Sequence, residues 1–175
     1  AMLELMLELG CKVSFVADNL EHREPYVSDL QRRGVEVLFH PYIASVPDLL
    51  AERGAEFDVI VVSRHYIAGP HVEAIRTFAP QARFVFDTVD LHFLREERLA
   101  ELNDSALGKA AARAKRDAEL ALIRKADATV VVSPVEKELL QRLAPDARVD
   151  MLSNIHELCG DGRPFAERHG IVFIG

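Results

Sequence analysis

The sequence predicts an α/β fold, a Rossmann-like doubly wound parallel sheet flanked by helices. Short apolar runs rich in β-branched residues recur along the chain, and helical patterns separate them. Alternation of strand and helix at short spacing is typical of βαβ units. The 175 residues, 49% of them hydrophobic, are enough to form one sizeable core.

Seven runs are expected to form strands. They lie at 13–16, 35–39, 59–62, 84–86, 129–132, 149–152 and 171–174. Several are apolar at every position, as in Val59-Ile60-Val61-Val62. Such continuous runs favour strands that are buried on both faces of a parallel sheet.

Helical patterns lie between these runs. They cover 1–9, 25–33, 47–53, 70–79, 93–125 and 135–143. Pro25 and Pro47 stand at helix starts, and Gly10, Gly34 and Gly54 follow helix ends, which are the usual places for these residues.

The segment 93–125 is long for this rhythm and would form either one long helix or two helices with a break near Asn103-Asp104-Ser105. Asp104 or Ser105 would cap the second helix. Lys and Arg dominate 109–125, which indicates a solvated face or a patch for an anionic substrate or membrane surface. A stripe at helical spacing predicts a closely packed face; it consists of Ala110, Ala114, Ala118, Ala121 and Leu122.

Composition argues against several classes of protein. No apolar run approaches the roughly 20 residues of a membrane span. The net charge of −7 argues against a nucleic-acid binder, because neutralising phosphates needs a basic surface. Cys11 and Cys159 lie far apart and are expected to be reduced thiols. The histidines show no metal-ligand spacing, and the sequence holds no glycine-rich dinucleotide or P-loop motif.

The chain opens on a helical pattern and closes on a strand pattern. We therefore expect a piece of a longer protein, with a Rossmann-like domain over 1–154. A polar linker is expected over 155–170, and 171–175 would begin a second domain.

Ligands of open parallel sheets bind beyond the carboxyl ends of the strands. Polar side chains follow four of the runs, in 63–66, 87–92, 133–134 and 153–154. We expect these segments to share one rim of the sheet. They hold imidazoles, carboxylates, hydroxyls and an arginine, which suit a polyhydroxy or anionic ligand.

Asp90 and His92 are the main catalytic candidates. A carboxylate two residues from an imidazole can fix its tautomer and raise its basicity, as a general base needs. In the alternative, Asp90 caps the following helix and His92 only packs. His65 is expected to be either a functional residue or a solvated one. Arg64 would pair either with a phosphate or with a neighbouring carboxylate. Ser133 would either cap helix 135–143 or contact substrate.

Several segments in order resemble the amino-terminal half of a bacterial group 1 (family 4) glycosyltransferase of the GT-B fold. They are 84–92, 126–133, 149–156 and 170–175. The last resembles the first strand of the carboxyl-terminal domain of that family.

The resemblance implies two Rossmann-like domains that face a cleft. The amino-terminal domain would hold a sugar or lipid-linked acceptor, and the carboxyl-terminal domain a nucleotide-sugar donor. The donor is a substrate, so no cofactor and no metal are expected. Such an enzyme transfers a sugar in surface glycan or polysaccharide biosynthesis, in the cytoplasm or peripherally at the inner membrane face. This chain alone would be inactive, because the donor half lies outside it.

The resemblance also implies roles for single residues. His92 and Asp90 would be catalytic, and the substrate-binding residues would be Arg64, His65, Thr88, Ser133 and Asn154. Some relatives carry a histidine directly before the aspartate, where this chain has Val89.

The first strand of the family and its glycine-bearing loop have no counterpart in this sequence. In the strand order 3-2-1-4-5-6 that strand is central. Strands 13–16 and 59–62 would then border an unfilled slot. We expect 171–174 to fill it, in cis or swapped within a homodimer.

A second interpretation is a non-catalytic flavodoxin-like signalling or interaction domain. A phosphoacceptor module would have an acidic pair after its first strand and Lys-Pro after a late one. This chain has Ser133-Pro134 at the late position.

Overall fold

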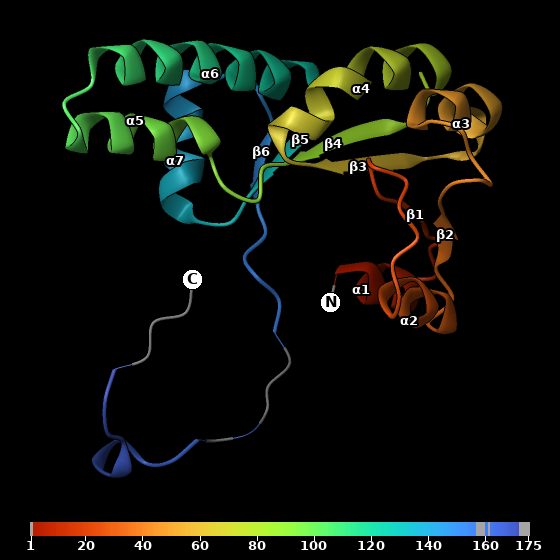
Figure 1. Ribbon diagram of the computed structural model, residues 1–175, viewed down its shortest axis with the longest axis horizontal. Coiled ribbons are helices and arrows are strands. Elements are labelled where there is room, and N and C mark those ends of the chain that lie inside the picture. Colours follow the sequence, from red (N-terminus) through yellow and green to blue (C-terminus); the bar gives the residue numbers. More distant parts are fainter. Residues whose placement is uncertain (1, 157–159, 161, 172–175) are drawn as a thin grey trace.

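The computed structural model describes residues 2–156, 160 and 162–171. It has an α/β architecture in which parallel sheets are flanked by helices (Figure 1). The predicted class is confirmed at this level, and the arrangement is compatible with a Rossmann-like fold.

The described strands form two separate parallel sheets. The larger has the order β3-β4-β5-β6, with bounds Val59–Ser63, Arg83–Asp87, Ala128–Val131 and Val149–Met151. The smaller pairs β1, Ser14–Val16, with β2, Glu36–Leu38. Six of the seven expected strands are therefore present. In the seventh, 172–174 lie outside the described residues, and Ile171 is fully exposed.

Seven α-helices connect these strands in the described part of the chain. They are α1 Met2–Glu8, α2 Tyr26–Arg32, α3 Val46–Arg53, α4 His65–Phe78, α5 His92–Leu102, α6 Ala106–Lys125 and α7 Pro134–Leu143. Two 3₁₀ turns, η1 and η2, cover Gly54–Glu56 and Phe165–Glu167.

The long helical segment forms two helices, α5 and α6, which is the second of the two expected alternatives. The Ser105 hydroxyl accepts a hydrogen bond from the Gly108 N–H at 3.0 Å and caps α6. The predicted start of α4 at residue 70 is wrong, because the helix begins at His65 and continues through Pro70. His65 and Tyr66 therefore stand on the first turn of a helix, not on a loop.

The main core lies between the larger sheet and the helices α4, α5, α6 and α7. Phe84 and Phe86 of β4 are fully buried, and Ile75, Phe93 and Ile123 pack in the same cluster. The alanine stripe of α6 is exposed except at Leu122, so that prediction is wrong. The buried positions of α6 are instead Ala112, Glu119, Leu120, Leu122 and Ile123.

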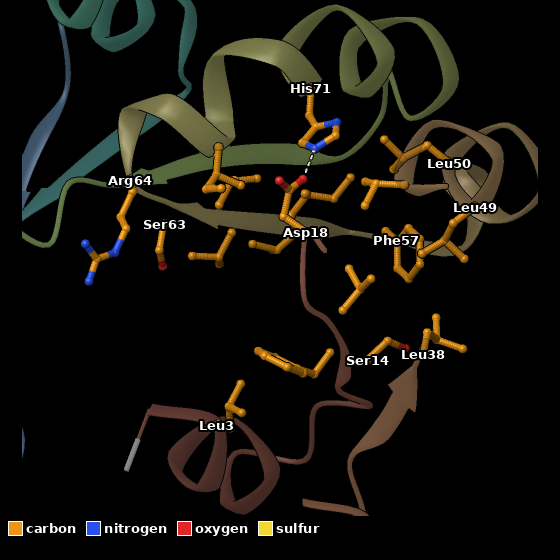
Figure 2. Close-up of a pocket in the computed structure, with 18 of the residues that line it drawn as sticks. Leu3, Ser14, Asp18, Leu38, Leu49, Leu50, Phe57, Ser63, Arg64 and His71 are labelled. Atoms are coloured by element: carbon orange, nitrogen blue, oxygen red, sulfur yellow. Dashed lines mark hydrogen bonds and ion pairs between the residues drawn. The ribbon is translucent and has the colours of Figure 1, made fainter. Parts of the chain in front are cut away.

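A groove of about 640 Å³ separates the two sheets. β1 lines one side and β3 the other, and Met2 and Leu3 of α1 also contribute. No described strand pairs with the outer edge of β1 or β3. Figure 2 shows Ser63 and Arg64 at one end of the groove and Leu49, Leu50 and Phe57 at the other.

None of the described helices combines the length and apolar character that a membrane span requires. Cys11 is an exposed free thiol, and Cys159 lies outside the described residues. Within the expected linker, the described residues are exposed.

Candidate functional site

The segments that follow β3 and β4 begin side by side. The two strands are parallel, with Ser63 opposite Asp87. The Ser63 hydroxyl donates to Oδ2 of Asp87 at 2.8 Å, and the Arg64 N–H donates to the Asp87 carbonyl at 2.8 Å. Both strands therefore deliver their next residues to one edge of the sheet, as expected for parallel neighbours.

Three rings gather at this edge. The centroids of His65 and His92 are 4.7 Å apart, and Tyr66 lies 5.5 Å from His65 and 5.6 Å from His92. His65 and Tyr66 begin α4, and His92 begins α5. His92 is 5% exposed and Tyr66 is 50% exposed, so the cluster extends from the core to the surface.

Asp90 and Arg95 surround the buried imidazole. Oδ1 of Asp90 lies 3.1 Å from Nε2 of His92, and its Oδ2 accepts from Nη1 of Arg95 at 2.9 Å. Nη2 of Arg95 lies 3.2 Å from Nδ1 of His92. Because a guanidinium can only donate, Nδ1 is the acceptor nitrogen, and the neutral ring carries its proton on Nε2. Nε2 is buried and has no hydrogen-bond partner in the described chain, because its contact with Asp90 is close but not aligned as a hydrogen bond.

The environment of both imidazoles favours their neutral form. Burial lowers the pKa of His92 below its usual range, and the Asp90 carboxylate partly opposes this shift. Burial also lowers the pKa of His65, and the neighbouring His92 adds to the effect. Nδ1 of His65 is buried and has no hydrogen-bond partner in the described chain. A neutral imidazole is the form that accepts a proton.

Two non-glycine residues with positive φ flank the cluster. Arg64 has φ 73° and Val89 has φ 62°. This region is unusual for a β-branched residue such as Val89 and costs energy. Strained backbone of this kind concentrates at functional sites.

The remaining predicted site residues do not join the rings. Thr88 is fully buried, and its hydroxyl donates to the Val130 carbonyl at 3.0 Å. Ser133 caps α7 by accepting from the Glu136 N–H at 3.3 Å. Asn154 borders a separate hollow of about 230 Å³ with Asp87 and Val89.

The expected single rim is therefore divided. His65, Asp90 and His92 meet, and the Arg64 guanidinium is close enough to influence the His92 pKa. Arg64 also borders the groove between the sheets, whereas Thr88, Ser133 and Asn154 lie elsewhere. Adjacent strands bring their end residues together, but the direction of each side chain depends on the following turn.

Two members of the cluster, Tyr66 and Arg95, were not among the residues predicted from the sequence. Tyr66 directly follows His65, and Arg95 stands one helical turn after His92. The spacing of His92 and Arg95 was the available signal, since residues three apart share a helix face.

An apolar hollow of about 450 Å³ adjoins Asp90 and Arg95. Leu91, Leu94, Leu99 and Leu102 line it, together with Arg98 and Glu136. Leu99 is 52% exposed and Leu102 is 84% exposed. The polar cluster thus continues into an apolar surface along α5, which we call the leucine shelf: Leu94, Leu99 and Leu102.

Within the described residues, no group of three or more His, Cys, Asp or Glu side chains is arranged to hold a metal ion. Comparison with known proteins found no matching family model, no matching curated protein and no matching solved structure.

Proposed function

We propose that this chain is the acceptor-binding half of a glycosyltransferase of the GT-B type, similar to the bacterial group 1 (family 4) enzymes. The observation that carries the proposal is the meeting of His65 and His92, 4.7 Å apart, with Asp90 against Nε2 of His92. The resemblance of segments 84–92, 126–133 and 149–156 to that family supports it.

The proposed reaction joins an acceptor hydroxyl to the anomeric carbon of a nucleotide sugar. The hydroxyl loses its proton to an imidazole, and its oxygen forms the new glycosidic bond. The bond from the anomeric carbon to the diphosphate breaks, and the nucleoside diphosphate leaves with the electron pair. The donor would be bound mainly by a second domain.

Within this chain, His92 is the proposed base. An acceptor hydroxyl that displaces Arg95 from Nδ1 would meet a free lone pair there. The Asp90 carboxylate, 3.1 Å from Nε2, would stabilise the imidazolium that forms. His65 and Arg64 would orient the acceptor.

The leucine shelf supports an acceptor with an apolar portion. The hollow that it lines adjoins Asp90 and Arg95, the two groups that flank the proposed base. Arg95 and Arg98 line the same hollow and would suit an anionic group near a lipid. The same surface would give peripheral contact with a membrane.

The test is a titration of the histidine-labelled chain followed by NMR. Methyl β-glucoside and octyl β-glucoside below its micelle concentration serve as probes. We expect shifts at His65 and His92 with both, and tighter binding of the octyl compound. Shifts at His65 that persist at equal strength in His92→Ala and Arg95→Ala variants would count against the site.

Two other results would contradict the proposal. The first is sugar transfer from a nucleotide sugar by this chain alone, which would place a donor site within it. The second is the absence of shifts with both glucosides, together with covalent modification by acetyl phosphate. That pair of results would favour the signalling interpretation.

A further inference from the structure

The start of α5 lacks a cap of its own. The residue at its N-cap position is Leu91, whose side chain makes no capping hydrogen bond. The first N–H groups of a helix need acceptors from outside the helix. Here they are important because His92 is the first residue of α5.

Two glutamates from other helices supply these acceptors. Oε2 of Glu119, in the middle of α6, accepts from the Phe93 N–H at 3.1 Å. Oε1 of Glu136, in the first turn of α7, accepts from the Leu91 N–H at 3.2 Å. The residues on both sides of His92 are therefore held by carboxyl groups from separate helices.

Of the two glutamates, Glu119 has the more unusual environment for a carboxyl group. It is fully buried, and its second oxygen, Oε1, has no hydrogen-bond partner in the described chain. Burial raises the pKa of Glu119, and the N–H groups of Phe93 and His92 partly oppose this. A buried carboxyl with one unpaired oxygen is costly, and an apolar residue would fill the same space at less cost.

We propose that Glu119 is a positioning residue for His92. By holding the Phe93 N–H, it fixes the first turn of α5 and so sets the place of the imidazole between Asp90 and His65. The geometric part of this proposal is independent of any reaction, and its catalytic consequence rests on the proposed function.

The charged and titratable groups around His92 come from three directions. Asp90 and Arg95 belong to α5 and the loop before it, Arg64 and His65 to the start of α4, and Lys115 and Glu119 to α6. A displacement of α5 would change the distances to all of them. The His92 titration is therefore a sensitive measure of its position.

Three variants of the chain test the proposal by NMR. Glu119→Gln keeps an oxygen that can accept from the Phe93 N–H, and Glu119→Leu removes it. Leu122→Ala removes a buried apolar side chain from α6 but takes away no hydrogen-bond acceptor from the start of α5. The readouts are the titration midpoint of His92 and the nuclear Overhauser contact between the rings of His65 and His92.

We expect Glu119→Gln to keep both readouts. Glu119→Leu should weaken the ring contact and move the His92 midpoint towards that of a free histidine, whereas Leu122→Ala should change neither. Unchanged readouts in Glu119→Leu, or equal changes in Leu122→Ala, would overturn the proposal.

A measurement on the unaltered chain remains decisive if Glu119→Leu does not fold. Hydrogen exchange at the Phe93 amide should be slower than at the Asp90 amide by about tenfold or more. Equal exchange at the two amides would also overturn the proposal. If these results hold but the glucosides do not bind, the positioning role stands and the proposed function fails.

Discussion

Asp18 and His71 meet across the groove between the two sheets. Oδ1 of Asp18, in the loop after β1, lies 2.5 Å from Nε2 of His71 in α4 (Figure 2). A second link joins β2 to α3, where Glu36 accepts from both terminal nitrogens of Arg53 at 3.0 Å. A two-stranded sheet is marginally stable by itself. These polar links therefore tie β1 and β2 to the rest of the molecule.

Removing the first link should loosen the smaller sheet selectively. In Asp18→Ala we expect the amides of β1 and β2 to exchange about fivefold faster, a loss of about 1 kcal/mol. The amides of β4 and β5 should be unaffected. Asp29→Ala, which breaks an exposed pair with Arg32 within α2, is the control. Uniform acceleration in all strands would contradict this prediction.

Asp90 should raise the pKa of His92, since its carboxylate opposes the effect of burial. In Asp90→Asn the pKa of His92 should therefore fall, as measured by NMR titration. Asp150→Asn removes a carboxylate from an exposed pair with Arg148 and is the matched control. An unchanged or raised His92 pKa in Asp90→Asn would show that the two groups do not interact.

The two lowered histidine pKa values predict a loss of stability in mild acid. Between each lowered value and the ordinary value of about 6.5, the unfolded chain binds more protons than the folded chain. The free energy of unfolding should therefore fall as the pH drops from about 7.5 to about 5.5, with a slope of at most about 1.4 kcal/mol per pH unit for each histidine.

Urea unfolding across this range, with a His65→Asn/His92→Asn variant, tests the assignment. The variant should show a smaller loss of stability. Glu119→Gln is a useful comparison, because the raised pKa of Glu119 acts in the opposite direction: its contribution is lost as the pH rises through the raised value. An equal loss of stability in the histidine variant would assign the pH dependence to other groups.

Gly54 and Gly69 form a matched pair for a test of packing. A Cβ atom at Gly54 would lie 2.3 Å from the Phe78 carbonyl oxygen, whereas at Gly69, inside α4, it would meet nothing within 4 Å. Gly54→Ala should therefore destabilise the fold by about 2–3 kcal/mol. Gly69→Ala should stabilise it by about 0.5–1 kcal/mol, because alanine favours the helix. Chemical denaturation measures both, and the same sign for both would contradict the described packing.

The open edge of β3 should promote self-association. Val59 is 52% exposed at this edge, and unpaired edges attract other strands. Val59→Lys should reduce the concentration dependence of the sedimentation coefficient. Leu107→Lys adds the same charge at an exposed position of α6, away from the groove. It should leave the concentration dependence of the sedimentation coefficient unchanged. Equal effects would show that net charge, and not the edge, controls association.

The strands could be predicted because their signal is local. A short apolar run of β-branched residues such as 59–62 favours a buried strand over other secondary structures. The break at Ser105 was predictable for the same reason, since a cap lies within three residues of its partner. The start of α4 was missed because Pro70 resembles a first-turn residue, whereas Arg64 at positive φ begins the helix earlier. At this position the Arg64 N–H donates to the Asp87 carbonyl of β4, a contact between segments that are far apart in the sequence.

The residues of the candidate site that are brought together by the order of the strands could be predicted. The residues whose role depends on the direction of the side chain could not. His65 and His92 meet because β3 and β4 are neighbours. Glu119 lies in a segment rich in Lys and Arg, which indicated a solvated face, yet its side chain turns inwards to the start of α5. The role of Glu119 becomes visible only in the packing of α6 against α5, where its carboxyl group accepts a hydrogen bond from the Phe93 N–H.

The close approach of the two imidazole rings has a further consequence. A positive charge on one ring would repel a positive charge on the other at 4.7 Å, so the first proton that the pair takes up in acid makes the uptake of a second less favourable. The two histidines therefore titrate as a coupled pair, and this edge of the sheet accepts one proton more readily than two.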